Sequence, residues 1–488
     1  MTGEVHISGN KRSRSSTKGA IESSNKYRKY DVPPHPNGVR PLGNIWLSDN
    51  LYNYRDESLG DFAPLIDQII LAMLETLEDP RDLVSLSLTS KGFYIFAQTD
   101  SLWKPMTLEA FEGDFCYRGS WKKTFSCETL KRKNKNEQVI LANINLKDFY
   151  SDVLYNQWYC STVDLSPWAT YENIERRSNL SLEEFIEKYE KPNRPVIITD
   201  IVPTTQWTKE NMLKNYGDTK FKTDQGVSMT LRDYFQYSSS IQEVSPMYLF
   251  DNMFADKAPS LRGAYEVPPY FKEDFFEMLP TKERPSYRWI LVGPARSGSS
   301  FHKDPNFTSA WNGLFSGCKK WILYPPEHVP PGVHPSEDGW EVETPEGVIE
   351  WFIDFYPQTK KAGAYRPVEA IMKPGELIFI PSSWWHTVLN IEESIAVTQN
   401  FVSKANLFNV NRFLKSKPSS QLYDAFQEAL NTNHPEVSKE LEEEMHRSGE
   451  NERIKKLKQP KKEKEAGKSF WDKLTKTGDT SVSFSLFD

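Results

Sequence analysis

The sequence is poor in cysteine and histidine. Its 488 residues include only four cysteines and eight histidines. Cys116, Cys127, Cys160 and Cys318 have no CxxC spacing and no secretory context, which is typical of reduced thiols in an intracellular protein. With so few histidines, the position of each one in the sequence can be considered individually.

The chain also lacks a long apolar run and an excess of basic charge. No stretch approaches the roughly 20 apolar residues that a membrane-spanning helix needs, and charged residues stand where a signal peptide would be apolar. The net charge is −7, which argues against a nucleic-acid binder because such proteins neutralise phosphates with basic residues. We therefore expect an intracellular protein, in the nucleus, the cytoplasm or both, with neither a membrane nor a nucleic-acid partner.

Apolar and aromatic residues are plentiful. The apolar fraction is 38%, with 14 Trp, 22 Tyr and 28 Phe, so a sizeable core is expected. The length predicts about two or three folded units plus tails. Residues 1–45 are rich in Ser, Lys, Arg and Pro and are expected to form a disordered basic arm. Its cluster Lys11-Arg12-Ser13-Arg14 is either a nuclear import signal or an ordinary solvated cluster.

A helical pattern follows in residues 58–107. Apolar residues repeat at three- and four-residue steps from Leu65 to Leu77, as one face of an amphipathic helix requires. Asp79-Pro80 and Ser90 are typical helix starts. Three short helices bury little surface by themselves, so this unit must pack on a neighbour or a partner.

The run LEDPRDLVSLSLTSKGFYIFAQTDSLWK resembles the F-box motif. The usual Leu-Pro opening is replaced by Phe62-Ala63-Pro64-Leu65. The resemblance implies binding to the Skp adaptor of a cullin-based ubiquitin ligase. The alternative is a three-helix module that only packs against the rest of the chain. The matching positions are Leu83, Leu86, Ser90, Phe93, Leu102 and Trp103.

Short strand patterns dominate residues 130–405. Segments such as Trp289–Val292, Lys320–Tyr324 and Glu376–Ile380 are rich in β-branched or aromatic residues and are bounded by Pro, Gly, Ser or Asn. Many short strands in one stretch predict a double-stranded β-helix, that is, a jelly roll or cupin-like barrel. Residues 406–488 are expected to form C-terminal helices and a charged tail. The predicted fold class is mixed α+β.

One histidine pattern indicates a metal site. His302 and Asp304 are two residues apart, so on a strand both side chains lie on one face. His386 follows shortly after the apolar run Leu377–Pro381. Two imidazoles and one carboxylate form the facial triad of non-haem iron(II) oxygenases, which leaves positions open for a cosubstrate and dioxygen. Alone, the pattern is a weak signal, because a single histidine is more often an ordinary core or surface residue.

Two longer stretches strengthen this interpretation. The segments GPARSGSSFHKDPNFTSAWNGLFSGCKKWILYPP and KPGELIFIPSSWWHTVLNIEESIAVTQNF resemble the Jumonji C family, within it most of all the phosphatidylserine-receptor-like branch described as lysyl hydroxylases and arginine demethylases. The likeness runs from about Glu172 to about Phe401. It implies that His302, Asp304 and His386 bind Fe(2+), and that 2-oxoglutarate and dioxygen are the cosubstrates.

The same resemblance implies a cosubstrate pocket. Lys319 matches the lysine that pairs with the distal carboxylate of 2-oxoglutarate, a role that suits a cation on a flexible stem in a partly dry pocket. Thr398 matches a hydroxyl that bonds the same carboxylate, and Asn312 and Tyr248 match further pocket positions. Ser299 stands where the family has a threonine and keeps the hydroxyl.

The resemblance implies a dioxygenase that converts 2-oxoglutarate to succinate and carbon dioxide while it hydroxylates a C–H bond of a protein substrate. On a side-chain methylene the product is a stable alcohol, whereas on an N-methyl group the product falls apart and demethylation results. The triad is the same for both reactions. We favour side-chain hydroxylation of the lysyl hydroxylase type, coupled to a ubiquitin ligase through the F-box. The alternatives are an N-methyl arginine or lysine demethylase that acts on histones and an F-box adaptor with little catalytic activity.

Overall fold

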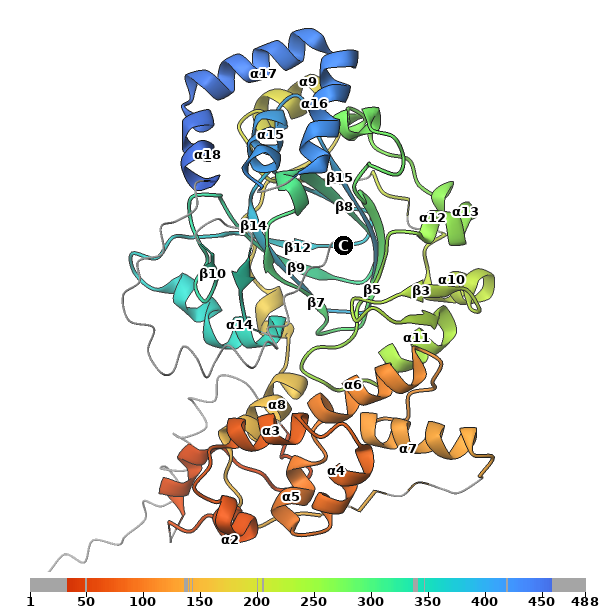
Figure 1. Ribbon diagram of the computed structural model, residues 1–488, viewed down its shortest axis with the longest axis vertical. Coiled ribbons are helices and arrows are strands. Elements are labelled where there is room, and N and C mark those ends of the chain that lie inside the picture. The colour runs from red at the N-terminus through yellow and green to blue at the C-terminus, as the bar shows by residue number, and fades with distance from the viewer. Residues whose placement is uncertain are drawn as a thin grey trace, which may run out of the picture.

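The chain folds into a central β-barrel with helices before and after it (Figure 1). The computed structural model describes residues 33–458 apart from 49–50, 136–138, 140, 143, 200, 204–205, 337–340, 346 and 418–419. The arrangement confirms the predicted mixed α+β class. None of the helices in these ranges is both long and apolar enough to cross a membrane.

A seven-stranded sheet forms one wall of the barrel, in the order β1-β2-β13-β8-β15-β6-β5. Its neighbouring strands are antiparallel except β1 and β2, which are parallel. Early and late strands therefore alternate across the sheet, as in a jelly roll. The strands are β1 (Arg176–Arg177), β2 (Val196–Ile198), β5 (Leu249–Asp251), β6 (Arg288–Gly293), β8 (Ser309–Ser316), β13 (Leu377–Ile380) and β15 (Ser394–Phe401).

A four-stranded antiparallel sheet forms the other wall, in the order β12-β9-β14-β7. Leu291 and Leu314 of the large sheet and Leu323 of the small sheet belong to one buried cluster. The apolar inner faces of two packed sheets thus form the barrel core, which is the predicted double-stranded β-helix. The strands are β7 (Gly298–His302), β9 (Lys319–Tyr324), β12 (Val368–Met372) and β14 (Trp385–Asn390).

The expected three-helix module is part of a larger helical unit. The predicted caps are present, since the Asp79 side chain accepts a hydrogen bond from the Arg81 amide and Ser90 accepts one from Phe93. The helices are η2 (Leu42–Leu47), α2 (Tyr54–Leu59), η3 (Gly60–Phe62), α3 (Asp67–Glu75), α4 (Pro80–Ser87), α5 (Lys91–Phe96), α6 (Asp100–Phe111), α7 (Trp121–Arg132) and α8 (Asp152–Thr162).

The helical unit includes residues that were expected to belong to the disordered arm. Val39 is 2% exposed, and the Arg40 amide donates to the Phe149 carbonyl at 3.0 Å. Residues 33–45 are therefore tied to the fold by a buried side chain and a backbone hydrogen bond. The rest of the expected arm, residues 1–32 with the basic cluster, lies outside the described residues.

The apolar pattern of α3 is divided between two faces. Ile70 and Leu74 are buried, but Ile69 and Met73 are 46% and 44% exposed. The side of α3 that carries Ile70 and Leu74 is covered by the rest of the unit, whereas the side that carries Ile69 and Met73, about 100° away around the helix, is left open. The prediction of a single buried face is wrong for Ile69 and Met73, which leaves apolar surface open on this helix.

Short elements surround the barrel and connect its strands. They are η4 (Ser166–Ala169), α9 (Leu182–Phe185), η5 (Ile186–Glu190), α10 (Lys209–Tyr216), β3 (Lys220–Lys222), β4 (Ser228–Thr230), α11 (Leu231–Ser240), α12 (Phe254–Lys257), α13 (Pro259–Arg262), η6 (Pro269–Phe271), η7 (Phe275–Met278), η8 (Pro305–Phe307), β10 (His334–Pro335), β11 (Val342–Glu343), α14 (Val348–Asp354) and η9 (Tyr356–Lys360). Helix α11 lies between the barrel and the N-terminal helices (Figure 1).

The helices after β15 cover the opposite end of the barrel (Figure 1). Phe426 and Leu430 pack with Phe276 in one buried cluster, and the rings of Phe413 and Phe307 lie 4.3 Å apart. The C-terminal helices are thus packed on the loop that follows His302. They are α15 (Leu407–Ser416), α16 (Gln421–Asn433), α17 (Pro435–Arg447) and α18 (Glu450–Lys458), and residues 459–488 lie outside the described residues.

Candidate metal and cosubstrate site

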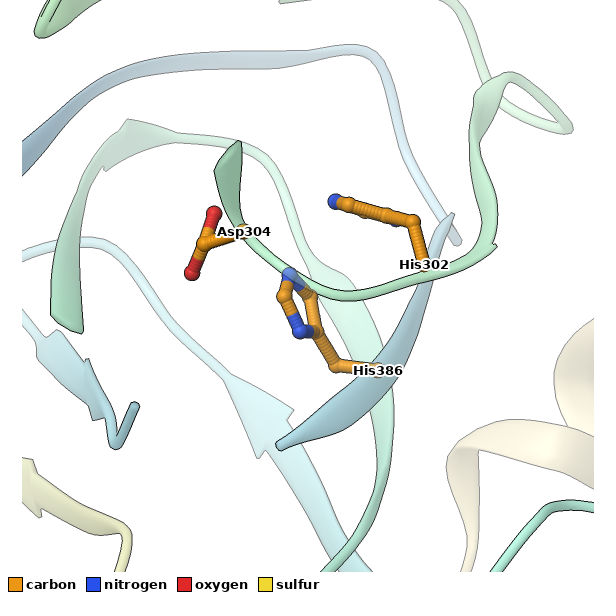
Figure 2. Close-up of side chains that lie close together, drawn as sticks. All are labelled: His302, Asp304 and His386. Atoms are coloured by element: carbon orange, nitrogen blue, oxygen red, sulfur yellow. The ribbon is translucent and has the colours of Figure 1, made fainter. Parts of the chain in front are cut away.

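His302, Asp304 and His386 come together in the structure. His302 ends β7, and His386 lies directly opposite it on β14. Candidate ligand atoms of the three side chains all lie within 4.8 Å of one another. Figure 2 shows the two rings and the carboxylate around one common space.

Both imidazoles can offer Nε2 to a metal, because Nδ1 of each ring lies next to a backbone carbonyl. The Nδ1 atom of His302 lies 2.7 Å from the Ser300 carbonyl, and Nδ1 of His386 lies 3.1 Å from the Trp384 carbonyl. Because a carbonyl oxygen only accepts, each Nδ1 carries the proton and each Nε2 is free to bind a metal. Burial lowers the pKa of both imidazoles to about 4, so both rings are neutral at pH 7, as metal ligands must be.

Asp304 supplies an oxygen that lacks a protein partner. Its Oδ2 atom is buried and has no hydrogen-bond partner among the described residues. Burial raises the pKa of the carboxyl to about 6, against the opposing effects of His302 and of a hydrogen bond from Asn400. A buried carboxylate is stabilised by a cation. Two imidazole nitrogens and one such oxygen fit iron(II).

Lys319 lies inside the barrel with its amine next to two neutral oxygens. Its side chain is fully buried, and its Nζ donates to the Tyr248 hydroxyl at 2.8 Å and to Asn390 Oδ1 at 2.7 Å. The next residue, Lys320, points to the other face, where it forms an ion pair with Glu369 at 2.8 Å. Because side chains alternate along a strand, the Lys319 amine lies on one face without an acidic partner among the described residues, and the Lys320 amine lies on the other face in an ion pair.

Within the part of the chain that the structure describes, no acidic side chain forms an ion pair with Lys319, and this explains why the surroundings of its amine suit an anion. Burial lowers the pKa of Lys319 to about 7, because neither the tyrosine hydroxyl nor the amide oxygen compensates an ammonium charge. A ligand carboxylate would compensate it. This is the chemistry that the distal end of 2-oxoglutarate offers.

Asn312 and Thr398 are paired across β8 and β15. Asn312 is 3% exposed, and its buried Oδ1 has no hydrogen-bond partner among the described residues. Thr398 donates from Oγ1 to the Trp311 carbonyl at 2.9 Å. A buried amide oxygen without a partner indicates that a ligand donor or water belongs there.

Ser299 lies on the His302 face because β7 contains an irregularity. Three positions separate the two residues, so strict alternation would place them on opposite faces. The register shifts between the pairs His386–His302 and Val388–Ser299, which leaves one extra residue in β7. Val388 belongs to the barrel core, and its partner Ser299 shares that face.

Sequence reasoning missed three polar residues of the site. Asn390 accepts from Lys319, Asn400 bonds to Asp304, and Trp321 has a buried Nε1 without a hydrogen-bond partner among the described residues. The Trp321 ring stacks at 6.0 Å from His386. For Asn390, the alternation of side chains along a strand could have predicted its place in the site, because it lies four residues after His386 on the same strand face.

Comparisons with known proteins agree with this geometry. The family described as Cupin-like domain matches residues 181–407. The chain is 42% identical to the arginine-specific demethylase JMJ22 of Arabidopsis thaliana over 93% of this chain and 90% of that protein. It is 38% identical to the bifunctional arginine demethylase and lysyl-hydroxylase psr-1 of Caenorhabditis elegans, over 53% of this chain and 68% of that protein. It is 27% identical to the human 2-oxoglutarate and iron-dependent oxygenase JMJD4, over 49% of this chain and 63% of that protein.

The fold, the cluster of His302, Asp304 and His386 and the named relatives together define a cupin-type oxygenase that depends on iron and 2-oxoglutarate. The chain belongs to the Jumonji C family. The predicted enzyme class and cosubstrates are thereby confirmed. The roles of the individual residues stay predictions, both for the metal ligands His302, Asp304 and His386 and for Lys319, Asn312, Thr398, Tyr248 and Ser299.

The pKa of Lys319 predicts how cosubstrate affinity depends on pH. In the free protein the ammonium form is lost above about pH 7, whereas a bound carboxylate would raise this pKa. Between the two values binding takes up a proton, so KM for 2-oxoglutarate should rise by up to about tenfold per pH unit above pH 7. The histidines and Asp304 titrate at about 4 and about 6, below this window.

The measurement is KM for 2-oxoglutarate from about pH 6.5 to pH 9 in wild type and Lys319→Arg. Because a guanidinium stays charged throughout this range, the variant should give a flat profile even if its KM is higher. Parallel slopes in the two proteins would show that another group controls binding.

Proposed function

We propose that this oxygenase acts on basic side chains of proteins and that its main reaction removes a methyl group from N-methyl arginine. The observation that carries this proposal is the likeness, over nearly the whole length of both chains, to a relative named an arginine-specific demethylase. The sequence alone favoured side-chain hydroxylation. Lysyl hydroxylation becomes the second candidate, because the name of the Caenorhabditis elegans relative joins both reactions.

Both candidate reactions begin with hydroxylation of a C–H bond. Bound iron and 2-oxoglutarate supply the activation of dioxygen for that step. In this chain, His302, Asp304 and His386 would hold the iron, and Lys319 would hold the cosubstrate. On an N-methyl group, the hydroxymethyl product breaks its C–N bond, and formaldehyde leaves while the nitrogen regains a hydrogen.

The decisive experiment offers the iron-loaded enzyme two peptides, one with methyl-arginine and one with unmodified lysine, and follows both by mass spectrometry. We expect loss of one methyl group from the arginine peptide, with formaldehyde and succinate formed in equal amounts. Gain of one oxygen atom on the lysine peptide alone would favour the second candidate. Proteins captured by a His386→Ala form would identify the natural target.

We also propose that the helical unit binds a Skp-type adaptor of a cullin ubiquitin ligase. The F-box positions Leu83 and Trp103 are 0% and 1% exposed and build the core of the unit. Other apolar side chains of the helical unit, in the quoted run and in the segment before it, remain at the surface, which is expected of a protein-binding face. We call this set the α3–α4 apolar surface: Phe62, Ile66, Ile69, Met73, Val84 and Leu88.

Replacement of Leu88 by Asp should weaken adaptor binding at least about tenfold, because the side chain is 79% exposed and a charge there would be buried on docking. Co-purification with the adaptor measures the effect. The matched control is Leu457→Asp on α18, where the leucine is 53% exposed. Unchanged binding of the Leu88 variant would favour the alternative in which the helices are only a packing module.

We further propose that the enzyme works in the nucleus and that Lys11-Arg12-Ser13-Arg14 directs it there. A fluorescent fusion of the full chain should lose its nuclear enrichment when these residues are replaced by alanine. Unchanged enrichment would assign the cluster to ordinary solvated surface.

A further inference from the structure

The backbone around Tyr248 is held by two tyrosines of α11. The Tyr237 hydroxyl accepts a hydrogen bond from the Met247 amide at 2.7 Å. The Tyr234 hydroxyl accepts from the Leu249 amide at 3.1 Å and lies 3.0 Å from the Met247 carbonyl. The residues on both sides of Tyr248 are therefore fixed by buried phenols rather than by a neighbouring strand alone.

Tyr248 itself is held by Asp224. The Tyr248 amide donates to Asp224 Oδ1 at 3.0 Å, and the Asp224 amide donates to the Tyr248 carbonyl at 2.8 Å. The phenol of Tyr248 then reaches the Lys319 amine. The placement of this pocket residue thus depends on side chains that lie outside the pocket.

Glu243 connects this arrangement to the N-terminal helices. Its carboxylate is buried and accepts hydrogen bonds from the Tyr237 hydroxyl and, at 2.9 Å, from the Trp121 indole of α7. Lys104 of α6 lies 3.4 Å from the same carboxylate and donates to the Ser245 carbonyl at 2.8 Å. Two helices of the N-terminal unit therefore hold a carboxylate that in turn holds α11.

We propose that Trp121, Glu243 and Tyr237 are positioning residues for 2-oxoglutarate, so that the N-terminal helical unit is a working part of the cosubstrate pocket. The inference rests on the proposed pocket roles of Tyr248 and Lys319. The Tyr237 hydroxyl donates to Glu243 and accepts from Met247, and such linked hydrogen bonds strengthen one another. Loss of the Trp121 indole donor removes one hydrogen bond from the buried Glu243 carboxylate, which weakens the hold of Glu243 on Tyr237.

The chain offers a matched pair of variants. Trp121 and Trp103 are both at most 1% exposed and both belong to the helical unit. The Trp103 indole donates to the Ala97 carbonyl at 2.7 Å, whereas the Trp121 indole donates to Glu243. Replacement of either tryptophan by phenylalanine removes one buried hydrogen bond. Only the acceptor of Trp121, Glu243, is connected through Tyr237 to the backbone next to Tyr248.

The experiment titrates 2-oxoglutarate calorimetrically into the full-length, iron-loaded protein without oxygen, and measures kcat and KM with oxygen. We expect Trp121→Phe to weaken 2-oxoglutarate binding by about three- to tenfold, the range of one buried hydrogen bond. The kcat at saturating 2-oxoglutarate should stay unchanged. Trp103→Phe should bind 2-oxoglutarate like the wild type while it loses a similar amount of thermal stability.

Tyr237→Phe provides the second route, because it breaks the same link inside the barrel domain and keeps the ring. It should raise KM for 2-oxoglutarate by a similar factor without lowering kcat. Wild-type affinity in both Trp121→Phe and Tyr237→Phe would overturn the inference, as would an equal loss in Trp103→Phe. If Lys319→Met also binds 2-oxoglutarate normally, the pocket assignment itself is overturned, which separates that failure from failure of the positioning role.

Discussion

Replacement of His302 by alanine is expected to abolish succinate release. His302 is one of the three proposed iron ligands, and a water molecule in its place would hold iron more weakly than an imidazole. Loss of an outer-shell partner of a metal ligand already costs about 10- to 100-fold in affinity or activity, so loss of the ligand should exceed 100-fold. The measurement combines iron content after dialysis with succinate formed from 2-oxoglutarate.

The control for this prediction is His446→Ala, since that histidine is exposed on α17. It should keep wild-type iron content and turnover. Equal succinate release by wild type and His302→Ala would contradict the assignment of the triad.

Replacement of Lys319 by methionine is expected to raise KM for 2-oxoglutarate by roughly 30-fold or more. Truncation of one partner of a buried charged contact costs about 2–5 kcal/mol, and 2 kcal/mol corresponds to a factor of roughly 30. Without ligand, the same variant should be as stable as the wild type or more stable, because it removes a buried ammonium that has no acidic partner among the described residues.

Lys320→Met is the matched control on the opposite face of β9. Its amine is ion-paired with Glu369, so the variant should lower the melting temperature and leave KM for 2-oxoglutarate near the wild-type value. The reverse pattern, with KM sensitive to Lys320 and insensitive to Lys319, would contradict the pocket assignment.

The sequence predicted those parts of the site that depend on local spacing or on family motifs. The two-residue step from His302 to Asp304 predicted that the two side chains lie together, and they do. The strand itself ends at His302, however, and Asp304 lies beyond it, directly before η8. The pairing of His386 with His302 depends on a cross-strand register, which no local pattern contains. Ser299 shows the same limit, because its face is decided by an irregularity in β7 that alternation alone would miss.

The contacts between the helical unit and the barrel could not be predicted at all. Trp121 looks like an ordinary core tryptophan and Glu243 like an ordinary loop acid until the fold brings them to 2.9 Å. Likewise, the periodicity of α3 identified a helix but not which of its apolar residues stay exposed. That division depends on what packs against the helix, as Ile69 and Met73 illustrate.

A crystal structure of the protein with iron and 2-oxoglutarate tests the central claim most directly. Anomalous scattering at the iron edge should give one peak bound by His302 Nε2, His386 Nε2 and an Asp304 oxygen, and the distal carboxylate of 2-oxoglutarate should lie against the Lys319 amine. An iron peak away from these three side chains, or a cosubstrate whose free carboxylate points away from Lys319, would contradict the account.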